Sequence, residues 1–390
     1  MTLKEQAMKR HYEWKGKIEV ISRTPITNRE ELSLAYTPGV AEPCLAIAAD
    51  PMKVYQLTRR QNLVAVITDG TAVLGLGDIG PEAAMPVMEG KCALFKEFAG
   101  IDAFPICIDS KDPQVIIDTI ALISKSFGGI NLEDISAPRC FEIETELKKR
   151  CDIPVFHDDQ HGTAIVVSAA LLNAIRVVDK QMGALEIVVN GAGAAGISIA
   201  KMLNQLGFGN VILCDLKGAL YEGADWLNPS QSEIAKNTNR ERKQGTLAEL
   251  LVGADVFIGV SKPNLVSREM IHSMADRAIV FPMANPTPEI MPEEARAGGA
   301  AVIGTGRSDF PNQINNVLAF PGIFKGALSV MAADITEPMK MAAARAIAAV
   351  VKPEQLSAEY ILPQAFDPEV VAAVARAVKE EAVSSGLNRL

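Results

Sequence analysis

Short apolar runs alternate with longer amphipathic stretches through the first half of the chain. Each short run is β-rich and ends in acidic or small residues, whereas apolar residues in the longer stretches recur at helical spacing. Strands that alternate with helices predict βαβ units and a parallel sheet, whose ligands gather at the carboxyl ends of the strands. The predicted strands of this first set are 62–70, 101–109, 130–136 and 153–159.

The pattern starts again after a long apolar helix, GTAIVVSAALLNAIRVV (162–178). Five further β-rich runs predict a second sheet, and the Ala-rich tail from 319 to 390 is predicted to be helical. The first thirty or so residues are polar and also predicted to be helical. There is no repeat and no low-complexity linker, so we expect two domains that meet closely around a cleft. The predicted strands of the second set are 185–190, 210–215, 254–260, 278–285 and 300–306.

Composition and charge narrow the class of protein. The chain has 390 residues, 48% hydrophobic and 22% charged, which is typical of a soluble globular protein with two domains. A net charge of −9 argues against nucleic acid or an anionic membrane surface as the main partner. No apolar run reaches bilayer length, and the charged start lacks the apolar segment of a signal peptide. Six cysteines without a CxxC pair are expected to be buried free thiols of a cytoplasmic protein.

The pattern GxGxxG occurs twice, and its context separates the two copies. GAGAAG (191–196) follows an apolar run directly and leads into a helix, as in a dinucleotide-binding fold. Asp215 ends the next strand, 19 residues after Gly196, where a carboxylate would bond the ribose hydroxyls. GLGDIG (75–80) fails this test, because the acidic residue at a comparable distance, Asp102, begins its strand. We interpret this first copy as a flexible turn at the rim of a site.

The second copy predicts a complete nucleotide-binding loop. Gly191 permits the tight turn, Gly193 lets a pyrophosphate approach the backbone, and Gly196 lets the helix pack on the strand. A carboxylate at position 215 repels a 2′-phosphate and favours NAD over NADP, although Lys217 offsets part of this preference. The predicted cofactor-binding residues are Gly191, Ala192, Gly193, Ala194, Ala195, Gly196 and Asp215.

Two pairs of acidic residues follow strands that are neighbours in the first predicted sheet. Glu133 and Asp134 end one run, and Asp158 and Asp159 end the next. Four carboxylates at one sheet edge repel each other unless a cation lies among them, and hard oxygen ligands suit Mg²⁺ or Mn²⁺ rather than zinc. The alternative is that each acid caps the turn or helix that follows it.

The stretch FHDDQH (156–161) also matches the spacing of a helical zinc site, because His157 and His161 are four residues apart. Such a site requires both histidines on one continuous helix. Residues 153–156 are predicted as a strand and the helix is predicted to begin near Gly162, so the break falls inside the motif. The histidines are therefore expected to be turn groups or neighbours of a metal site, with Asp159 as a metal ligand.

Seven segments carry a resemblance to a known family. From about residue 20 to about residue 330 they resemble malic enzyme in its compact bacterial form, and they occur in the family's order. The segments are YTPGVAEPC (36–44), TDGTAVLGLGDIGPEAAMPVMEGK (68–91), NLEDISAPRCFEIE (131–144), HDDQHGTA (157–164), NGAGAAG (190–196), ANPTPEI (284–290) and QINNVLAFPG (313–322).

The resemblance implies oxidative decarboxylation of (S)-malate to pyruvate and CO₂, with NAD(P)⁺ and Mn²⁺ or Mg²⁺. Asp158 is expected to bond Lys91 or the groups around the metal, and a lysine base requires a lowered pKa. The implied roles are metal ligands for Glu133, Asp134 and Asp159, general acid for Tyr36, general base for Lys91, and substrate binding for Lys91, Asn285 and Asn316.

The predicted fold class is α/β, with two domains built on parallel sheets. Residues 1–160, completed by C-terminal helices within 318–390, would form the substrate- and metal-binding domain. Residues 161–317 would form a Rossmann-type NAD(P)-binding domain. An N-terminal arm and apolar surfaces are consistent with a homodimer, and malate is the expected small-molecule partner.

One departure from the family pattern and three alternatives stay open. Larger malic enzymes carry an arginine that grips malate's carboxylate where this chain has Ala72, so another basic residue, such as Lys15 or Arg23, would have to serve. A malolactic enzyme would convert malate to lactate and retain its NAD. An amino-acid dehydrogenase with the same plan would not need the acidic cluster, and a non-catalytic nucleotide sensor would not turn over substrate.

Overall fold

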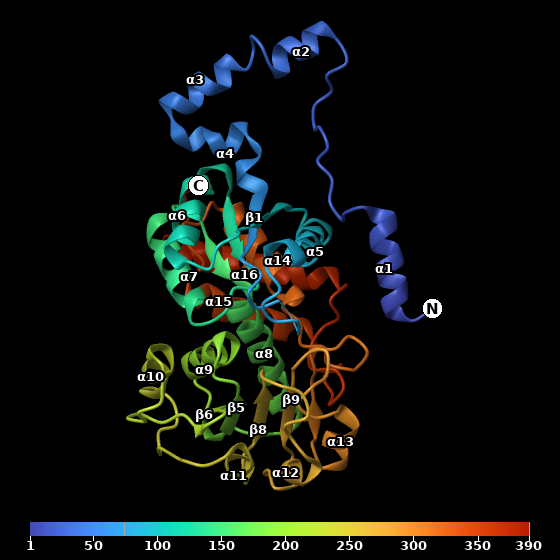
Figure 1. The fold of residues 1–390 in the computed structure, drawn as a ribbon, viewed down its shortest axis with the longest axis vertical. Helices are drawn as coiled ribbons and strands as arrows, with labels where there is room; N and C mark the ends of the chain where they lie inside the picture. Colours follow the sequence, from blue (N-terminus) through green and yellow to red (C-terminus); the bar gives the residue numbers. More distant parts are fainter. Residues whose placement is uncertain (74, 390) are drawn as a thin grey trace.

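The computed structural model describes residues 1–73 and 75–389, and the upper part of the body in Figure 1 contains a four-stranded sheet. The strand order is β2-β1-β3-β4, and every pairing is parallel. All residues of β3 and nearly all of β1 are buried, as expected of a parallel sheet covered by helices. The strands are β1 (Leu63–Thr68), β2 (Asp102–Cys107), β3 (Gly129–Leu132) and β4 (Val155–His157).

The lower part of Figure 1 contains the second sheet, with the order β10-β9-β8-β5-β6-β7. All five predicted strands are present and parallel, so the predicted α/β class with two parallel sheets is confirmed. The sequence did not predict β7, which pairs antiparallel with β6 and is too short to carry an alternating pattern. The strands are β5 (Glu186–Asn190), β6 (Asn210–Asp215), β7 (Gly218–Ala219), β8 (Val256–Gly259), β9 (Ile279–Pro282) and β10 (Val302–Ile303).

Helix α8 (Asp158–Val177) joins the two sheets (Figure 1). It begins at Asp158 directly after β4, so the prediction of a start near Gly162 was wrong by one turn. Two acidic residues in the first turn suit the positive end of the helix dipole, and the β-pattern before them had hidden this start. The other helices beside the sheets are α5 (Pro81–Ala99), α6 (Pro113–Ile123), α7 (Arg139–Arg150), α9 (Ala194–Leu206), α10 (Pro229–Ala235), α11 (Leu247–Leu251), α12 (Arg268–His272) and α13 (Pro292–Ala297).

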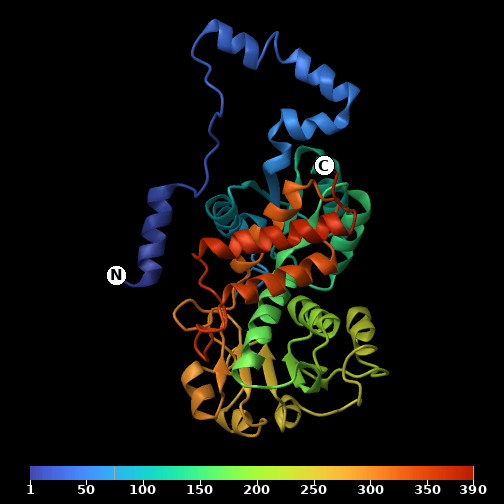
Figure 2. The ribbon, with the colours of Figure 1, turned by 180° about the vertical axis from the view of Figure 1, so that it is seen from behind.

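The C-terminal helices return to the first sheet (Figure 2). Phe95 of α5 packs edge-on against Phe320 and Phe324, with ring centroids 4.8 and 5.2 Å away. The tail is not helical throughout, because residues 351–367, which include Pro353 and Pro363, form turns and loops. The helices are α14 (Phe320–Ser329), which the short 3₁₀ helix η5 (Asn316–Leu318) precedes, α15 (Glu337–Val350) and α16 (Pro368–Ser384).

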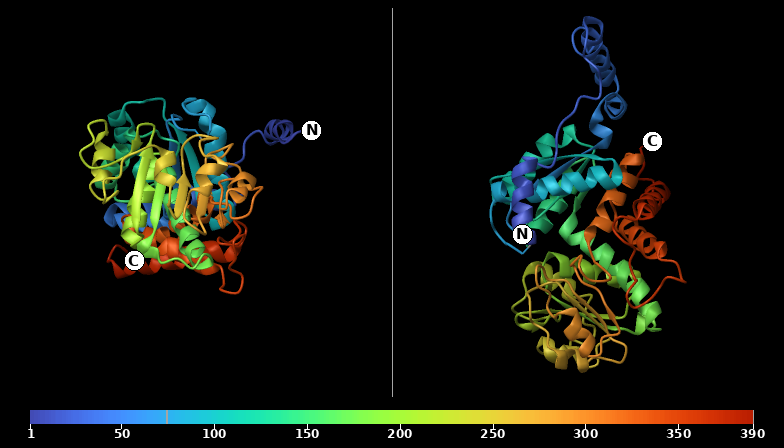
Figure 3. Two further views of the ribbon diagram at one scale, coloured as in Figure 1. Left: turned by 90° about the horizontal axis from the view of Figure 1, so that it is seen from below. Right: turned by 90° about the vertical axis from the view of Figure 1, so that its right-hand side faces the viewer.

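In the N-terminal arm, α2 and α3 project away from the body, whereas the chain directly after α1 contacts α5 (Figures 1 and 3). Residues 15–28 are not helical, so the prediction for the first thirty residues holds only for α1 and the start of α2. Apolar side chains along the arm are exposed, among them Val20, Leu34 and Leu45. The arm contains α1 (Leu3–Trp14), α2 (Arg29–Ala35), α3 (Ala41–Ala49) and α4 (Val54–Leu57).

One large apolar core continues from the first sheet to the second. It includes Val64 and Phe156 of the first sheet, Ile165 and Leu171 of α8, and Val189 of the second sheet. Four of the six cysteines are buried free thiols, whereas Cys107 is half-buried and Cys44 is exposed, contrary to expectation. Among the described residues, no helix combines the length and apolar character needed to cross a bilayer.

Candidate functional site

Three carboxylates converge at the carboxyl end of the first sheet. Glu133 and Asp134 follow β3, and Asp159 lies in the first turn of α8. Each offers one oxygen, and these oxygens lie within 4.8 Å of one another. Asp134 adopts a left-handed backbone conformation (φ 53°), and its N–H donates to Asp159 Oδ2 at 2.9 Å. The parallel register of β3 and β4 therefore brings the two predicted acidic pairs together.

The charges of this acidic triad oppose one another. Burial, followed by the charges of Asp159 and Glu133, raises the pKa of Asp134 to about 9. Burial also raises the pKa of Glu133 and of Asp159. Asp134 Oδ2 is buried without a hydrogen-bond partner. A converging set of buried oxygens with an unpaired acceptor fits a hard divalent cation.

Lys91 of α5 lies beside this triad and contacts Asp158. Its Nζ is 3.0 Å from Glu133 Oε1 and also donates to Asp158 Oδ2, which accepts a second hydrogen bond from Asn316 Nδ2 at 2.5 Å. The lysine ammonium also lies 4.1 Å from the centre of the Phe320 ring. Asp158 thus connects Lys91 to Asn316. Its contact with Lys91 is one of the two that were expected for it, whereas its contact with Asn316 was not predicted.

The pKa of Lys91 differs from the sequence expectation. Burial disfavours the charged ammonium, but the charges of Asp158 and Glu133 outweigh this effect, so the pKa of Lys91 is raised rather than lowered. Burial in turn raises the pKa of Asp158 to about 8, although Lys91 opposes the shift. Lys91 is therefore a buried ammonium held between two carboxylates rather than an isolated lysine.

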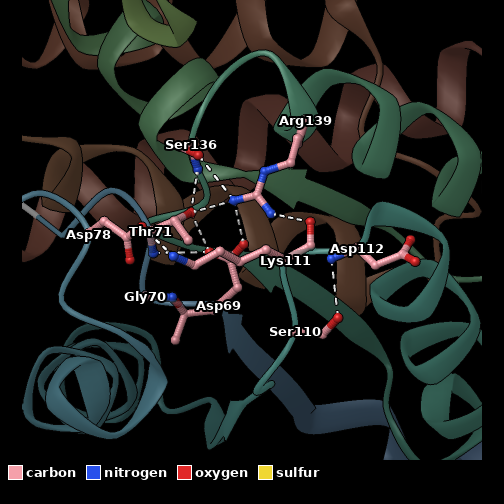
Figure 4. Close-up of polar contacts among 10 residues, drawn as sticks. Asp69, Gly70, Thr71, Asp78, Ser110, Lys111, Asp112, Ser136 and Arg139 are labelled. Atoms are coloured by element: carbon pink, nitrogen blue, oxygen red, sulfur yellow. Dashed lines mark hydrogen bonds and ion pairs between the residues drawn. The ribbon is translucent and has the colours of Figure 1, made fainter.

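An ion pair between Arg139 and Asp69 connects the loops that follow β1 and β3 (Figure 4). Arg139 Nη2 donates to Asp69 Oδ2 and Thr71 Oγ1, each at 2.9 Å, and to Ser136 Oγ at 3.1 Å. The next residue of the turn, Ala72, donates its N–H to the Asp134 carbonyl at 2.9 Å. Sequence reasoning missed Asp69 and Arg139, because only the fold brings them together.

The glycine loop has the geometry that its sequence predicts. Gly191 has φ 118°, and a Cβ there would lie 2.6 Å from the Val260 carbonyl. A Cβ on Gly196 would lie 1.8 Å from the Gly191 carbonyl, so helix α9 can approach only without a side chain. A Cβ on Gly193 would meet nothing within 4 Å, which leaves its backbone open to a ligand.

Asp215 ends β6 and is held in place from both sides. Leu216 N donates to Oδ1 at 2.7 Å, and Gln231 Nε2 donates to Oδ2 at 2.9 Å. Lys217, two residues after Asp215, places its ammonium 5.8 Å from the centre of the Trp226 ring. Sequence reasoning missed Gln231, which lies 16 residues beyond Asp215 on α10 and forms a capping box with Asn228.

A cavity of about 1480 Å³ joins the acidic triad to the glycine loop. Lys91 and the triad line it from the first sheet, and η5 contributes Asn316. The part of the chain that forms the second sheet contributes Ala195, Ser261 and Asn285. Gly75 and Leu76 of the first GxGxxG copy also line the cavity, so this copy is a turn at the rim rather than a strand-to-helix loop.

Tyr36 and the two histidines of the FHDDQH stretch do not have the positions that a catalytic acid or a helical zinc site would need. Tyr36 ends α2 on the arm, is 67% exposed, and is not among the described residues that line the cavity. His157 ends β4 and His161 lies in α8, so the two histidines do not share a helix. His161 Nε2 instead lies 2.8 Å from Glu144 Oε1, and Nδ1 lies 3.0 Å from Lys340 Nζ.

Comparison with known proteins places these features in one family. Residues 15–118 match the malic enzyme N-terminal domain, and residues 160–383 match the malic enzyme NAD-binding domain. The bifunctional malic/malolactic enzyme of Bacillus subtilis is 56% identical, with 100% of this chain and 95% of the relative covered. The NAD-dependent malic enzyme of Geobacillus stearothermophilus is also 56% identical, with 96% of this chain and 78% of the relative covered.

Solved structures agree with this assignment. The NAD-dependent malic enzyme of Thermotoga maritima has a TM-score of 0.92 at 51% identity, covering 96% of this chain and 98% of its own. The Pyrococcus horikoshii malic enzyme has a TM-score of 0.95 at 50% identity, covering 100% and 92%. The fold and the glycine loop define a two-domain oxidoreductase with a Rossmann-type nucleotide domain. The chain belongs to the malic enzyme family, whose members are NAD(P)-dependent and decarboxylating.

Replacing Arg139 by leucine should weaken both stability and metal binding. Asp69 would remain buried without its partner, so the free energy of unfolding should fall by about 2 to 3 kcal/mol. The loop through Ala72 and Asp134 should loosen, so Mn²⁺ titration should give a higher Kd. Denaturant unfolding and metal titration measure the two effects.

Lys111→Met is the matched control. Lys111 pairs with Asp78 at the surface of the same region, with both side chains about half exposed or more (Figure 4). Loss of such a pair should change the free energy of unfolding by less than about 0.5 kcal/mol. Equal effects of the two substitutions, or an unchanged Mn²⁺ Kd in Arg139→Leu, would contradict the supporting role of Arg139.

Proposed function

We propose that this chain oxidatively decarboxylates (S)-malate to pyruvate and CO₂ while reducing NAD⁺, with Mn²⁺ or Mg²⁺ as a required ion. One observation carries the proposal. The acidic triad, Lys91 and Ala195 of the dinucleotide-type glycine loop line the same cavity. The relatives from Geobacillus stearothermophilus and Escherichia coli are named NAD-dependent and NADP-dependent malic enzymes, which supports the reaction.

Glu133, Asp134 and Asp159 would hold the metal ion. The unpaired Asp134 Oδ2 and the raised pKa values of the three carboxylates support this ligand set, because a divalent cation would offset their repulsion. When bound, the ion would supply Lewis-acid polarisation of the substrate's hydroxyl and, after oxidation, of its C2 carbonyl.

Lys91 would accept the substrate's hydroxyl proton as hydride leaves C2. A protonated lysine cannot do this, so its own proton must first pass to a neighbour. Asp158 is that neighbour, since it accepts a hydrogen bond from Lys91. Asn316 donates to the same carboxylate and keeps it facing Lys91. Asn285, across the cavity, would orient the substrate.

The nucleotide would bind along residues 191–196 with its ribose hydroxyls at Asp215. Both Asp215 oxygens already accept hydrogen bonds, so the carboxylate is fixed in place. A 2′-phosphate would bring two negative charges to this carboxylate, while the ammonium of Lys217 lies against Trp226. These contacts support NAD as the preferred nucleotide.

Tyr36 would protonate C3 of the enolate. Within one chain, however, the arm holds Tyr36 away from the cavity of that same chain. The arm projects from the body and exposes Leu32, Leu34 and Tyr36. A second copy of the chain would cover these apolar residues and could receive Tyr36 at its own cavity. We therefore propose a homodimer in which the acid and the base come from different chains.

Malolactic activity is the second candidate function, because the relative from Bacillus subtilis is named a bifunctional malic/malolactic enzyme. The two reactions differ in their products. Oxidative decarboxylation releases NADH and pyruvate, whereas malolactic turnover releases lactate without net NADH.

The purified protein should reduce NAD⁺ in the presence of malate and Mn²⁺. Chelation by EDTA should abolish turnover, because the triad alone cannot polarise the substrate, and added Mn²⁺ should restore it. Absorbance at the NADH band and chemical assay of pyruvate and lactate measure the outcome. Lactate without NADH would favour the malolactic function, and full activity in EDTA would contradict the metal requirement.

Lys91→Ala should lower kcat by about 1000-fold or more, because it removes the proposed base, while the Kd of NAD⁺ should stay unchanged. Lys96→Ala is the control, since Lys96 lies on the same helix and pairs with Asp102 at the surface. Steady-state kinetics and nucleotide titration measure the two quantities. Near-normal kcat in Lys91→Ala would rule out its role as base.

Asp215→Ala should lower the ratio of kcat/KM for NAD⁺ to that for NADP⁺ by about 10-fold or more, because the charge that repels the 2′-phosphate is lost. Glu222→Ala removes a nearby surface carboxylate that pairs with Arg242, and it should leave the ratio unchanged. Kinetics with both nucleotides give the ratio. A ratio that does not change in Asp215→Ala would mean that other residues set the preference.

A further inference from the structure

The proposed substrate is a dianion, whereas the walls of the cavity carry the acidic triad. One substrate carboxylate can lie at the metal site, but the other needs a cationic partner of its own. The described residues that line the cavity include three basic side chains, His11, Lys17 and Lys91. Lys91 already contacts two carboxylates, Asp158 and Glu133. Lys17 contacts neither of these carboxylates.

Lys17 is fixed to the cavity wall by its own backbone and side chain. Helix α1 is followed by Lys15 (φ 53°) and Gly16 (φ 117°), two left-handed residues that turn the chain toward α5. Lys17 N donates to Glu89 Oε2 at 3.1 Å, and its Nζ donates to the Pro86 carbonyl at 2.6 Å. Ile18 then packs against the apolar core. The ammonium is thus held in position before any ligand arrives.

The ammonium of Lys17 lies against α5, the helix that carries the proposed base. Its Nζ would be 3.9 Å from a Cβ on Gly90, the residue directly before Lys91. Pro86 and Gly90 are one helical turn apart on α5, and both line the cavity. An ammonium has three hydrogens, and only one of them is donated to the Pro86 carbonyl, so the others can face a ligand.

We propose that Lys17 binds a carboxylate of the substrate and makes the site selective for dicarboxylates over monocarboxylates. The inference rests on the proposed function. Lys17 would also take the place of the arginine that larger malic enzymes carry at the position of Ala72. Ala72 has no basic side chain, and its backbone N–H donates to the Asp134 carbonyl. Lys17 supplies that positive charge from the start of the arm.

Lys17→Met, which removes the charge but keeps the apolar stem, tests the inference. The KM for malate should rise about 10- to 100-fold, as for the loss of one charged hydrogen bond. Both kcat and the KM for NAD⁺ should stay within about 2-fold, because the lost contact is present in substrate and transition state alike. Lys17→Arg should restore most of the affinity. Lys9→Met, which removes an exposed lysine of α1 that pairs with Glu13, should behave as the wild type.

Competitive inhibitors distinguish two possible roles of Lys17: a charged contact with the substrate, and an anchor that holds the arm on α5. In Lys17→Met, the inhibition constant of tartronate, a hydroxy dicarboxylate, should rise about 10-fold or more, whereas that of glycolate, its monocarboxylate counterpart, should change less than about 2-fold. Equal losses for both inhibitors, or a parallel loss of kcat and of nucleotide affinity, would show an anchoring role and overturn the inference.

Direct measurement of malate binding distinguishes a failure of this inference from a failure of the proposed function. Malate is titrated into the wild-type protein and Lys17→Met, each saturated with Mg²⁺ and NADH. Equal Kd values would overturn the role of Lys17 even if the wild type oxidises malate. A wild type that binds malate without turning it over would overturn the proposed function, and a weaker Kd in Lys17→Met would still support the contact.

Discussion

The structure is organised around an unfavourable interaction, the repulsion among four carboxylates at one sheet edge. The parallel pairing of β3 with β4 places Glu133 and Asp134 beside Asp158 and Asp159. Lys91 and the Asp134 N–H offset part of this repulsion from within the site. What they leave uncompensated is seen in the raised pKa of Asp134, so the residues that would bind a cation are those that destabilise the free site.

The same edge also connects the two halves of the molecule. Helix α8 starts at the acidic cluster, and its apolar length belongs to a core that continues into the second sheet. Asn316 lies in η5, far along the chain, and reaches Asp158. A movement of the second unit relative to the first would therefore strain the contacts of Asp158, and through it those of Lys91. Charge placement and domain arrangement depend on each other here.

Local patterns predicted most of the fold and part of the site. Each strand between 62 and 306 with a clear apolar run is present, and the glycine loop has the predicted geometry, because both signals lie within a few consecutive residues. Arg139, Gln231 and Lys17 were missed, since each acts on residues that only the fold brings near. The raised pKa of Lys91 was missed for the same reason: two acids from different elements outweigh burial.

The N-terminal arm would make the site depend on a second chain as well. An exposed tyrosine, leucine or valine on a projecting segment gains nothing from folding alone, because its apolar surface stays in water. The body holds a cavity with a lysine but no tyrosine among the described residues that line it, while the arm carries Tyr36 in solvent. If Tyr36 is the acid, the complete site exists only where two chains meet. Catalytic competence would then follow association by mass action, and dilution would remove the acid before it unfolded the chain.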